Sequence, residues 1–197
     1  MPRLTETRQR QTRRAIADAA IDLFTERGYA EVTMEDVAEA AGVSRRTAYR
    51  HFPNKYDLVF DHTQRWLECF EAVVATREDG ESTRSIIRRG VLAVAEEIDE
   101  TADEVLAAWT VFVGHESLRG RNARAQEMWL LAHAGLLQPD LPEPGDALEV
   151  MTVAGALVAM TNALCFTWVA GRPQSNMVEL TEQALDILDP LWPAASR

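Results

Sequence analysis

The stretch TMEDVAEAAGVSRRTAYRHFPNKYDL, Thr33 to Leu58, contains the pattern that decides the fold. Thr33 is a good N-cap, and Asp36 three residues later completes the pairing of a capping box at the start of a helix. The apolar residues that follow recur at the spacing of one helix face. This short helix is expected to end at Gly42, because glycine readily adopts the left-handed conformation of a tight turn.

A second short helix is expected directly after this turn. Ser44 is a good N-cap for it, and Pro53 disfavours helical geometry at the residue before it, so the helix ends near Phe52. Two short helices joined by a tight glycine-containing turn form a helix-turn-helix, whose second helix enters the major groove of DNA. The sequence therefore predicts a recognition helix over residues 44–52.

The two faces of this recognition helix differ in chemistry. Ala48 and Phe52 lie one turn apart and are apolar, so they mark the packed face. Arg46 and Arg50 point nearly opposite, and an arginine can bond two acceptors of guanine at once in the major groove. The stretch from Ser44 to Lys55 contains three arginines, one lysine and no acidic residue. A solvated basic surface is the alternative interpretation of this cluster.

Five further residues of the region are candidates for contact with DNA. Thr47 can meet a thymine methyl group, and Tyr49 can reach a phosphate. Arg45 lies in the first turn, where recognition helices meet base edges. Lys55 begins the next helix and combines its charge with free backbone N–H groups, which suits a phosphate. His51 lies partly toward the core, so packing or a backbone hydrogen bond is an equal alternative for it.

The basic stretch stands out because the chain as a whole is acidic, with a formal net charge of -11. Residues 1–55 hold ten Lys or Arg against eight Asp or Glu, whereas residues 56–197 hold ten against twenty-three. Five arginines and one glutamate lie within residues 1–14. We expect residues 3–14 to contact phosphates or the minor groove rather than to read bases.

The quoted stretch resembles the DNA-binding signature of the tetracycline-repressor (TetR) family of bacterial transcription regulators. The resemblance covers roughly residues 8–58, with turn, recognition helix and the following Phe-Pro-x-Lys step in register. It implies a homodimer that binds a palindromic double-stranded DNA operator. It also implies a variable, all-helical body that binds a small-molecule effector.

Position by position, the resemblance assigns phosphate contacts to Thr33, Tyr49 and Lys55. Many members have Gly where this chain has Arg46, and Leu is common where it has Ala48, so the base sequence recognised is not transferable. The residues to which it assigns base reading or groove lining are Arg45, Arg46, Thr47 and Arg50. The full set of predicted DNA-binding residues is Thr33, Ser44, Arg45, Arg46, Thr47, Tyr49, Arg50, His51 and Lys55.

The remainder of the chain also shows helical periodicity, and no β-alternating run of useful length is present. We expect an all-α fold of about nine helices, with a three-helix helix-turn-helix domain at residues 1–55 and an effector-binding and dimerisation domain at residues 56–197. Besides the two short helices, the predicted helices cover about 7–27, 54–78, 82–99, 102–115, 121–137, 146–170 and 176–191.

The stretch from Val150 to Ala170 contains no charged residue and is long enough to cross a membrane. Polar residues dilute it and no basic flank follows the positive-inside pattern, so we favour a buried central helix and expect no membrane partner. Small residues at four-residue spacing permit close helix approach, and with the final helix they resemble the dimerisation bundle of the family. Packing within one chain is the alternative. The predicted dimer-interface residues are Gly155, Ala159, Ala163, Leu185 and Leu188.

The body also has aromatic and polar residues where a core usually has aliphatic ones. Such residues suit a cavity with apolar walls and few hydrogen-bonding groups, which binds a small hydrophobic or aromatic effector. Core packing is the alternative for each of them. The histidine spacing specifies no metal geometry, so neither a metal nor a cofactor is expected. The predicted ligand-binding residues are Trp109, Phe112, His115, Trp129, His133, Asn162 and Phe166.

Together these features favour a one-component transcriptional regulator, most simply a repressor that an effector releases from DNA. Two alternatives stay open, namely a DNA-binding protein controlled by a protein partner and an enzyme that uses buried histidines. An enzyme is not expected, because no nucleophile elbow or phosphate loop is recognisable. Cys69 and Cys165 suit reduced thiols, and no apolar signal segment is present at the start of the chain. We therefore expect a cytoplasmic protein, associated with the nucleoid when bound to DNA.

Overall fold

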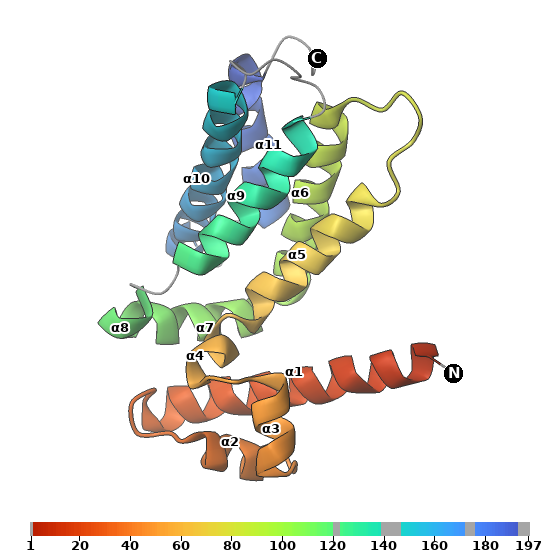
Figure 1. The fold of residues 1–197 in the computed structure, drawn as a ribbon. Helices are drawn as coiled ribbons and strands as arrows, with labels where there is room; N and C mark the ends of the chain where they lie inside the picture. The colour runs from red at the N-terminus through yellow and green to blue at the C-terminus, as the bar shows by residue number, and fades with distance from the viewer. Residues whose placement is uncertain (1, 120–122, 139–146, 172–175, 193–197) are drawn as a thin grey trace. The chain divides into compact units, whose positions relative to one another are not determined.

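The computed structural model describes residues 2–119, 123–138, 147–171 and 176–192, and these residues form helices and connecting turns (Figure 1). Eleven α-helices and one 3₁₀-helix are present and no strand occurs among the described residues, which confirms the all-α prediction. The chain divides into two compact units. Unit 1 comprises Met1–Gln64 and Ala102–Arg121, and unit 2 comprises Arg65–Thr101 and Asn122–Arg197.

Unit 1 is built on the long helix α1, which contacts α2, α4 and α7. Its core is apolar and fully buried at Ile16, Ala20, Val37, Ala48 and Phe52, so the two short helices of the helix-turn-helix are anchored on α1. Burying this many apolar side chains is the main favourable contribution to the stability of the unit. Its helices are α1 (Pro2–Arg27), α2 (Met34–Ala40), α3 (Arg45–His51), α4 (Lys55–Val59), the start of α5 (Asp61–Val74), α7 (Ala102–Gly114) and α8 (Glu116–Arg119).

The helix predicted over residues 54–78 is interrupted at Phe60, which separates α4 from α5. Phe60 has φ -107° and ψ 15°, outside the helical range. Its ring packs against Tyr56 at 4.6 Å and edge-on against Phe112 of α7 at 5.5 Å. The break therefore coincides with long-range aromatic packing that the helical periodicity of this segment does not indicate.

Unit 2 packs α10 against α9 and α11, and α6 against α11. The carboxylate of Asp99, at the end of α6, accepts the backbone N–H groups of Met177 at 3.0 Å and Val178 at 3.2 Å. These N–H groups belong to the first turn of α11 and have no partner within that helix, so Asp99 caps it from a neighbouring helix. The unit contains the rest of α5, α6 (Thr83–Glu100), α9 (Ala123–Leu137), α10 (Ala147–Gly171), α11 (Met177–Leu188) and the 3₁₀-helix η3 (Asp189–Leu191).

Helix α10 is the one helix among the described residues that is long and apolar enough to span a membrane by length and composition. Eight of its side chains are buried within the unit, among them Leu157, Leu164 and Trp168. A helix that packs on two neighbours in a folded unit meets the same composition test. Helix α10 therefore packs one face inside unit 2, while other apolar side chains of it, such as Leu148 and Phe166, stay exposed.

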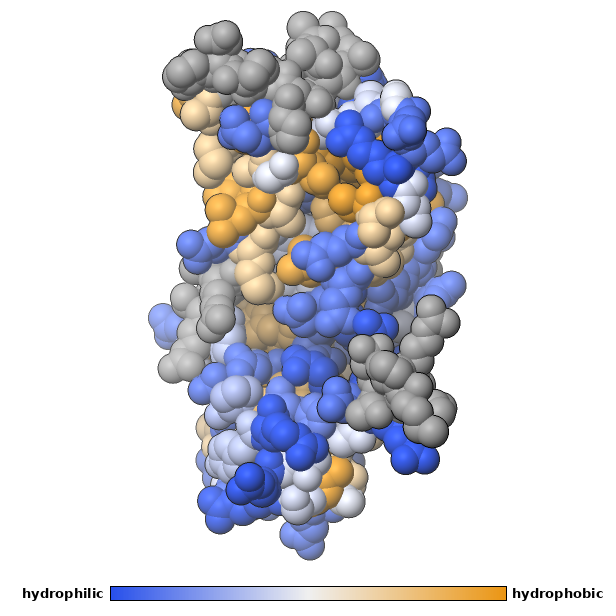
Figure 2. All heavy atoms as spheres, turned by 45° about the vertical axis from the view of Figure 1, so that its right-hand side comes forward, coloured by the Kyte–Doolittle hydropathy of each residue, from blue (hydrophilic) through white to orange (hydrophobic). Residues whose placement is uncertain are grey.

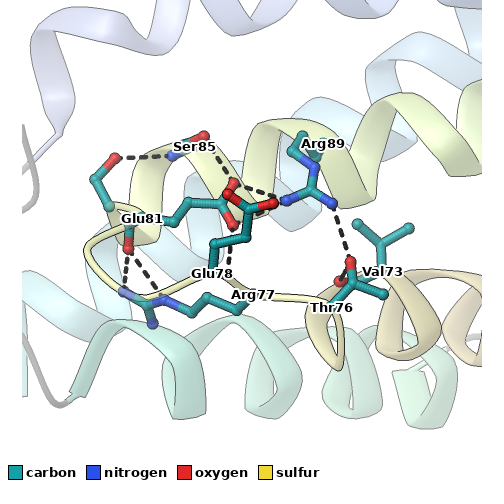
Figure 3. A network of polar contacts seen from close by, with 8 residues as sticks. Val73, Thr76, Arg77, Glu78, Glu81, Ser85 and Arg89 are labelled. Atoms are coloured by element: carbon teal, nitrogen blue, oxygen red, sulfur yellow. Dashed lines mark hydrogen bonds and ion pairs between the residues drawn. The ribbon is translucent and has the colours of Figure 1, made fainter.

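A network of polar contacts closes the turn between α5 and α6 (Figure 3). The Arg77 guanidinium donates to the backbone oxygen of Glu81 at 2.8 and 3.1 Å. The Glu81 carboxylate accepts from Arg89 at 2.8 and 2.9 Å and from Ser85 at 2.9 Å, and Arg89 also donates to Thr76. The Arg89 hydrogen bond is the largest of the causes that lower the pKa of Glu81. Because the Arg89 guanidinium is exposed to water, the network orders the turn and adds little to stability.

Gly90, buried in the middle of α6, is required by the ring of Phe70. A Cβ atom at this position would lie 2.5 Å from Cδ2 of Phe70. We expect Gly90→Ala to lower the free energy of unfolding by about 1 kcal/mol, because overpacking costs ~1–3 kcal/mol and exceeds the helix-propensity gain of ~1 kcal/mol. Urea unfolding measures this change.

Gly135 of α9 provides the matched control. It is exposed, and no atom lies within 4 Å of a Cβ built there. Gly135→Ala is therefore expected to raise the free energy of unfolding by up to about 1 kcal/mol. Equal changes in the two variants would show that Phe70 yields to the added methyl group.

Candidate DNA-binding site

The turn between α2 and α3 has the geometry of a helix-turn-helix. Gly42 has φ +64°, in the left-handed region that favours glycine. The Val43 N–H donates to the oxygen of Ala38 at 2.9 Å, so the turn folds back on the end of α2. Ser44 caps α3 by accepting the Thr47 N–H at 3.1 Å. This cap uses the Ser44 hydroxyl for structure, and a second hydrogen bond of 2.9 Å joins it to the Thr47 hydroxyl.

Helix α2 begins with the capping box expected from the sequence. The Thr33 hydroxyl accepts the Asp36 N–H at 3.1 Å, and the Asp36 carboxylate accepts the Thr33 N–H at 2.7 Å. The hydrogen bonds from Thr33 are the main cause that lowers the pKa of Asp36. Thr33 thus has a structural role at the start of α2, and its side chain remains exposed at the surface.

The face of α3 opposite the core presents two arginines. Ala48 and Phe52 are completely buried, whereas Arg46 and Arg50 are exposed. Neither arginine makes a hydrogen bond or ion pair with another residue that the structure describes. Tyr49 lies beside them and is 40% exposed. Two guanidinium groups and a phenol on one outer face match the chemistry that reads base edges and phosphates.

Arg45 is held differently from the other two arginines of α3. Its guanidinium forms an ion pair with Glu35 of α2 and lies 5.9 Å from the centre of the Tyr49 ring. The pair is exposed and therefore weak, so contact with a phosphate can replace it. Arg45 is thus oriented by Glu35 of α2.

The Lys55 side chain makes hydrogen bonds within unit 1. Its ammonium group donates to the backbone oxygens of Tyr29 at 2.6 Å and Val32 at 3.0 Å, and it lies 4.3 Å from the centre of the Tyr29 ring. Burial is the main cause that lowers the pKa of Lys55. The side chain therefore ties α4 to the segment between α1 and α2, a role that the sequence does not indicate.

We expect Lys55→Met to lower the free energy of unfolding by about 1–3 kcal/mol, because the carbonyl groups of Tyr29 and Val32 lose a charged donor. Urea unfolding gives this value. Arg46→Met is the matched control, since it removes an exposed cation without an internal partner and is expected to leave stability within about 0.5 kcal/mol. Weaker DNA binding by Lys55→Met with unchanged stability would assign the ammonium group to a phosphate alone.

Arg13 of α1 supports the end of the recognition helix. Its guanidinium pairs with the buried carboxylate of Asp61 at 2.6 Å and donates to the backbone oxygen of His51 at 2.9 Å. It also lies over the ring of Phe52, 4.2 Å from the centre. Sequence reasoning assigned Arg13 to the basic segment that contacts DNA. Its partner Asp61 lies 48 positions away, so no local pattern reveals the pair.

His51 lies at the end of α3 with a partly buried ring. Burial is the largest of the causes that lower its pKa, and the neighbouring Arg50 and Arg13 charges act in the same direction. The neutral form of the imidazole is therefore favoured.

The predicted ligand-binding residues fall into both units. Trp109, Phe112 and His115 belong to unit 1, where Phe112 packs against the core and the His115 ring lies tilted against that of Tyr29, with ring centres 5.2 Å apart. In unit 2, Trp129 and His133 line a small cavity. Asn162 donates to the backbone oxygen of Val158 within α10 at 3.1 Å, and Phe166 is 59% exposed. Of the predicted ligand-binding residues, Trp129 and His133 therefore lie together at one cavity.

The predicted dimer-interface residues also differ in placement. Ala159 and Ala163 are exposed on α10, and Gly155 is partly exposed beside them. On α11, Leu188 is partly exposed, whereas Leu185 is buried inside unit 2 and faces its own core. The neighbouring Ile187, absent from the prediction, is 76% exposed.

No group of three or more His, Cys, Asp or Glu side chains among the described residues is arranged to hold a metal ion.

In a comparison with protein families, the helix-turn-helix region is the part of the chain that matches a known family. Residues 16–61 match the family described as bacterial regulatory proteins, tetR family. The transcriptional regulator TcmR of Streptomyces glaucescens is 35% identical over 81 residues, which are 41% of this chain and 36% of TcmR. TtgR of Pseudomonas putida is 46% identical over 59 residues, which are 30% of this chain and 28% of TtgR. The matched segment thus spans about a third of the length of these relatives.

Solved structures are similar over most of the chain. FadR of Thermus thermophilus in complex with lauroyl-CoA has a TM-score of 0.63 at 23% identity, covering 92% of this chain and 95% of FadR. The SmeT–triclosan complex has a TM-score of 0.65 at 22% identity and covers 91% of both chains. At 22–23% identity, this similarity shows a shared fold.

Proposed function

We propose that this chain, which belongs to the tetR family of bacterial regulatory proteins, is a one-component transcriptional regulator. In this proposal it binds a palindromic DNA operator as a homodimer and acts as a repressor that a small, apolar effector releases. The observation that carries the proposal is the outer face of α3. Arg46 and Arg50 are exposed there without an internal partner among the described residues, while the opposite face is fixed in the core.

The homodimer is supported by an exposed apolar stripe on α10. Leu148, Met151, Ala159 and Phe166 follow one another at spacings of three, eight and seven residues, which places them on one side of the helix. Leu148 is 77% and Phe166 59% exposed, and Ile187 of α11 adds further apolar surface. Figure 2, in which the right-hand side of Figure 1 comes forward, shows apolar residues at the surface of unit 2 as well. A second copy that covers the stripe removes this surface from water.

Release by an effector requires that the ligand binds two arrangements of the protein with different affinity. Helix α5 begins in unit 1 at Asp61 and continues in unit 2 up to Val74, so one helix belongs to both units. At its start Asp61 bonds Arg13, which contacts His51 and Phe52 at the end of α3. A shift of α5 caused by a ligand in unit 2 therefore alters the support of the recognition helix.

The class of effector is supported by the mostly apolar walls of the small cavity in unit 2 and by two solved structures of similar fold. FadR was solved with lauroyl-CoA and SmeT with triclosan, and both ligands carry large apolar groups. A regulator that binds DNA acts in the cytoplasm, at the nucleoid while it is bound.

The experiment that tests the proposal is selection of DNA from a random pool, followed by fluorescence anisotropy over a range of salt concentrations. We expect an inverted repeat that binds two chains, with an affinity that falls steeply as salt rises. The oligomeric state is measured in the same samples by light scattering. A folded dimer that enriches no sequence, or binds all sequences alike, would contradict the proposal.

A further inference from the structure

Unit 2 contains a small cavity between α6, α9, α10 and α11. Its volume of about 20 Å³ is enough for one water molecule. Aliphatic side chains of α6 form one wall, including Val91, Val94 and Ile98, and Met177 of α11 closes one end. Asp99 holds the first turn of α11 next to Ile98, so the position of Met177 is fixed by a hydrogen-bonded cap.

One polar atom of a residue that lines this cavity lacks a partner among the described residues. His133 of α9 lines the cavity and is 1% exposed, and its Nδ1 atom has no hydrogen bond to any described residue. Burial lowers the pKa of His133 to about 4, so the ring is neutral near pH 7. An unpaired buried nitrogen is costly, and a group that pairs with it gains that energy on binding.

None of the described residues that line the cavity is charged. The other lining residues with polar groups are Trp129, with its indole N–H, Cys165, with its thiol, and Thr161, whose hydroxyl already donates to the backbone oxygen of Leu157 at 3.1 Å. Burial raises the pKa of Cys165 to about 12, so the thiol is also neutral. An ionised ligand would be buried without a counter-charge, which is strongly unfavourable.

Aromatic rings surround His133. Its ring centre lies 5.0 Å from that of Phe70, which meets it edge-on, and 5.7 Å from that of Trp129. Phe70 is fixed in place because it packs directly over Gly90. Trp129 is partly exposed, whereas the aliphatic wall is buried. A molecule larger than water must displace a lining side chain to enter, and Trp129 is a large, partly exposed one.

We infer that this cavity binds a neutral aromatic molecule that carries a single hydroxyl group, with the hydroxyl on Nδ1 of His133 and the ring beside Trp129. A hydroxyl both donates and accepts, so it pairs with Nδ1 in either tautomer of a neutral imidazole. The inference rests on the proposed function, because it names the effector class of a regulator. It assigns His133 as the residue that distinguishes a phenol from the matching hydrocarbon.

Three probes of similar shape test this assignment, namely 4-ethylphenol, ethylbenzene and 4-ethylbenzoate. Isothermal titration calorimetry compares them on the full chain near neutral pH. Wild type is expected to bind 4-ethylphenol about tenfold more tightly than ethylbenzene, as one buried hydrogen bond provides, and to bind 4-ethylbenzoate most weakly. His133→Phe keeps the ring and is expected to bind 4-ethylphenol and ethylbenzene equally. His133→Gln keeps a neutral hydrogen-bonding group and is expected to retain most of the preference.

Several outcomes would overturn the inference: no binding of any probe to folded wild type, equal binding of phenol and hydrocarbon, tightest binding of the benzoate, or a preference that persists in His133→Phe. Anisotropy with the selected operator, run on the same samples, separates this failure from failure of the proposed function. If the protein binds its operator but gives any of these probe results, only the assignment of the ligand hydroxyl to His133 is contradicted. If the protein binds 4-ethylphenol as expected but binds no operator, only the proposed function as a transcriptional regulator is contradicted.

Discussion

Replacing Arg46 and Arg50 together with alanine is expected to weaken binding to the selected operator by about 2–6 kcal/mol, because a good bidentate contact with a base contributes ~1–3 kcal/mol. Both side chains are exposed and have no internal partner among the described residues, so the folded state loses nothing when they are removed. Urea unfolding of the variant should match that of wild type. Fluorescence anisotropy on the operator and on an unrelated duplex gives the two affinities that are compared.

Two further double variants separate base reading from charge. Arg46→Lys with Arg50→Lys keeps both positive charges but loses the planar guanidinium, so it should retain nonspecific binding and lose preference for the operator. Arg84→Ala with Arg88→Ala removes the same charge from α6, where the two arginines pair with Asp189 and Asp186. This variant is expected to bind the operator almost as wild type does. Equal losses in the two alanine variants, with no loss in the lysine variant, would mean that α3 contributes only net charge.

The helix-turn-helix could be predicted because its determinants are local. Thr33 with Asp36, the left-handed Gly42 and the Ser44 cap each act within four residues, and the structure has all three. The packed face of α3 follows from helical periodicity alone, since Ala48 and Phe52 are one turn apart and both are fully buried. The all-α class follows in the same way from apolar spacing along the rest of the chain.

Long-range contacts account for what the sequence left open. Lys55 bonds carbonyl groups near residue 30, and Arg13 bonds Asp61, so neither partner can be found by spacing. Helix α7 packs on α1, and this contact places Trp109, Phe112 and His115 in unit 1, whereas His133 belongs to unit 2. Whether an aromatic side chain lines a cavity or fills a core depends on which helix it meets, and composition does not encode that choice.

Acid is expected to destabilise the wild type more than His133→Phe. Burial lowers the pKa of His133 to about 4 from the ordinary value of 6.5. Between these values the unfolded chain binds a proton that the folded chain does not, so the free energy of unfolding falls as the pH drops from about 6.5 to about 4. The penalty is absent above this window and reaches about 3 kcal/mol below it, at ~1.4 kcal/mol per pH unit.

Urea unfolding at pH 7 and at about pH 4.5 gives the change in the free energy of unfolding for each protein. The change in wild type minus the change in His133→Phe is the contribution of His133. His51 and the carboxylates with lowered pKa, Asp36 and Glu81, titrate in both proteins and cancel in the comparison. We expect wild type to lose about 2–3 kcal/mol more than the variant over this range. Identical losses would mean that the folded protein accepts a proton on His133 as readily as the unfolded chain. The cavity would then admit a charge, and the argument for a neutral ligand would fail with it.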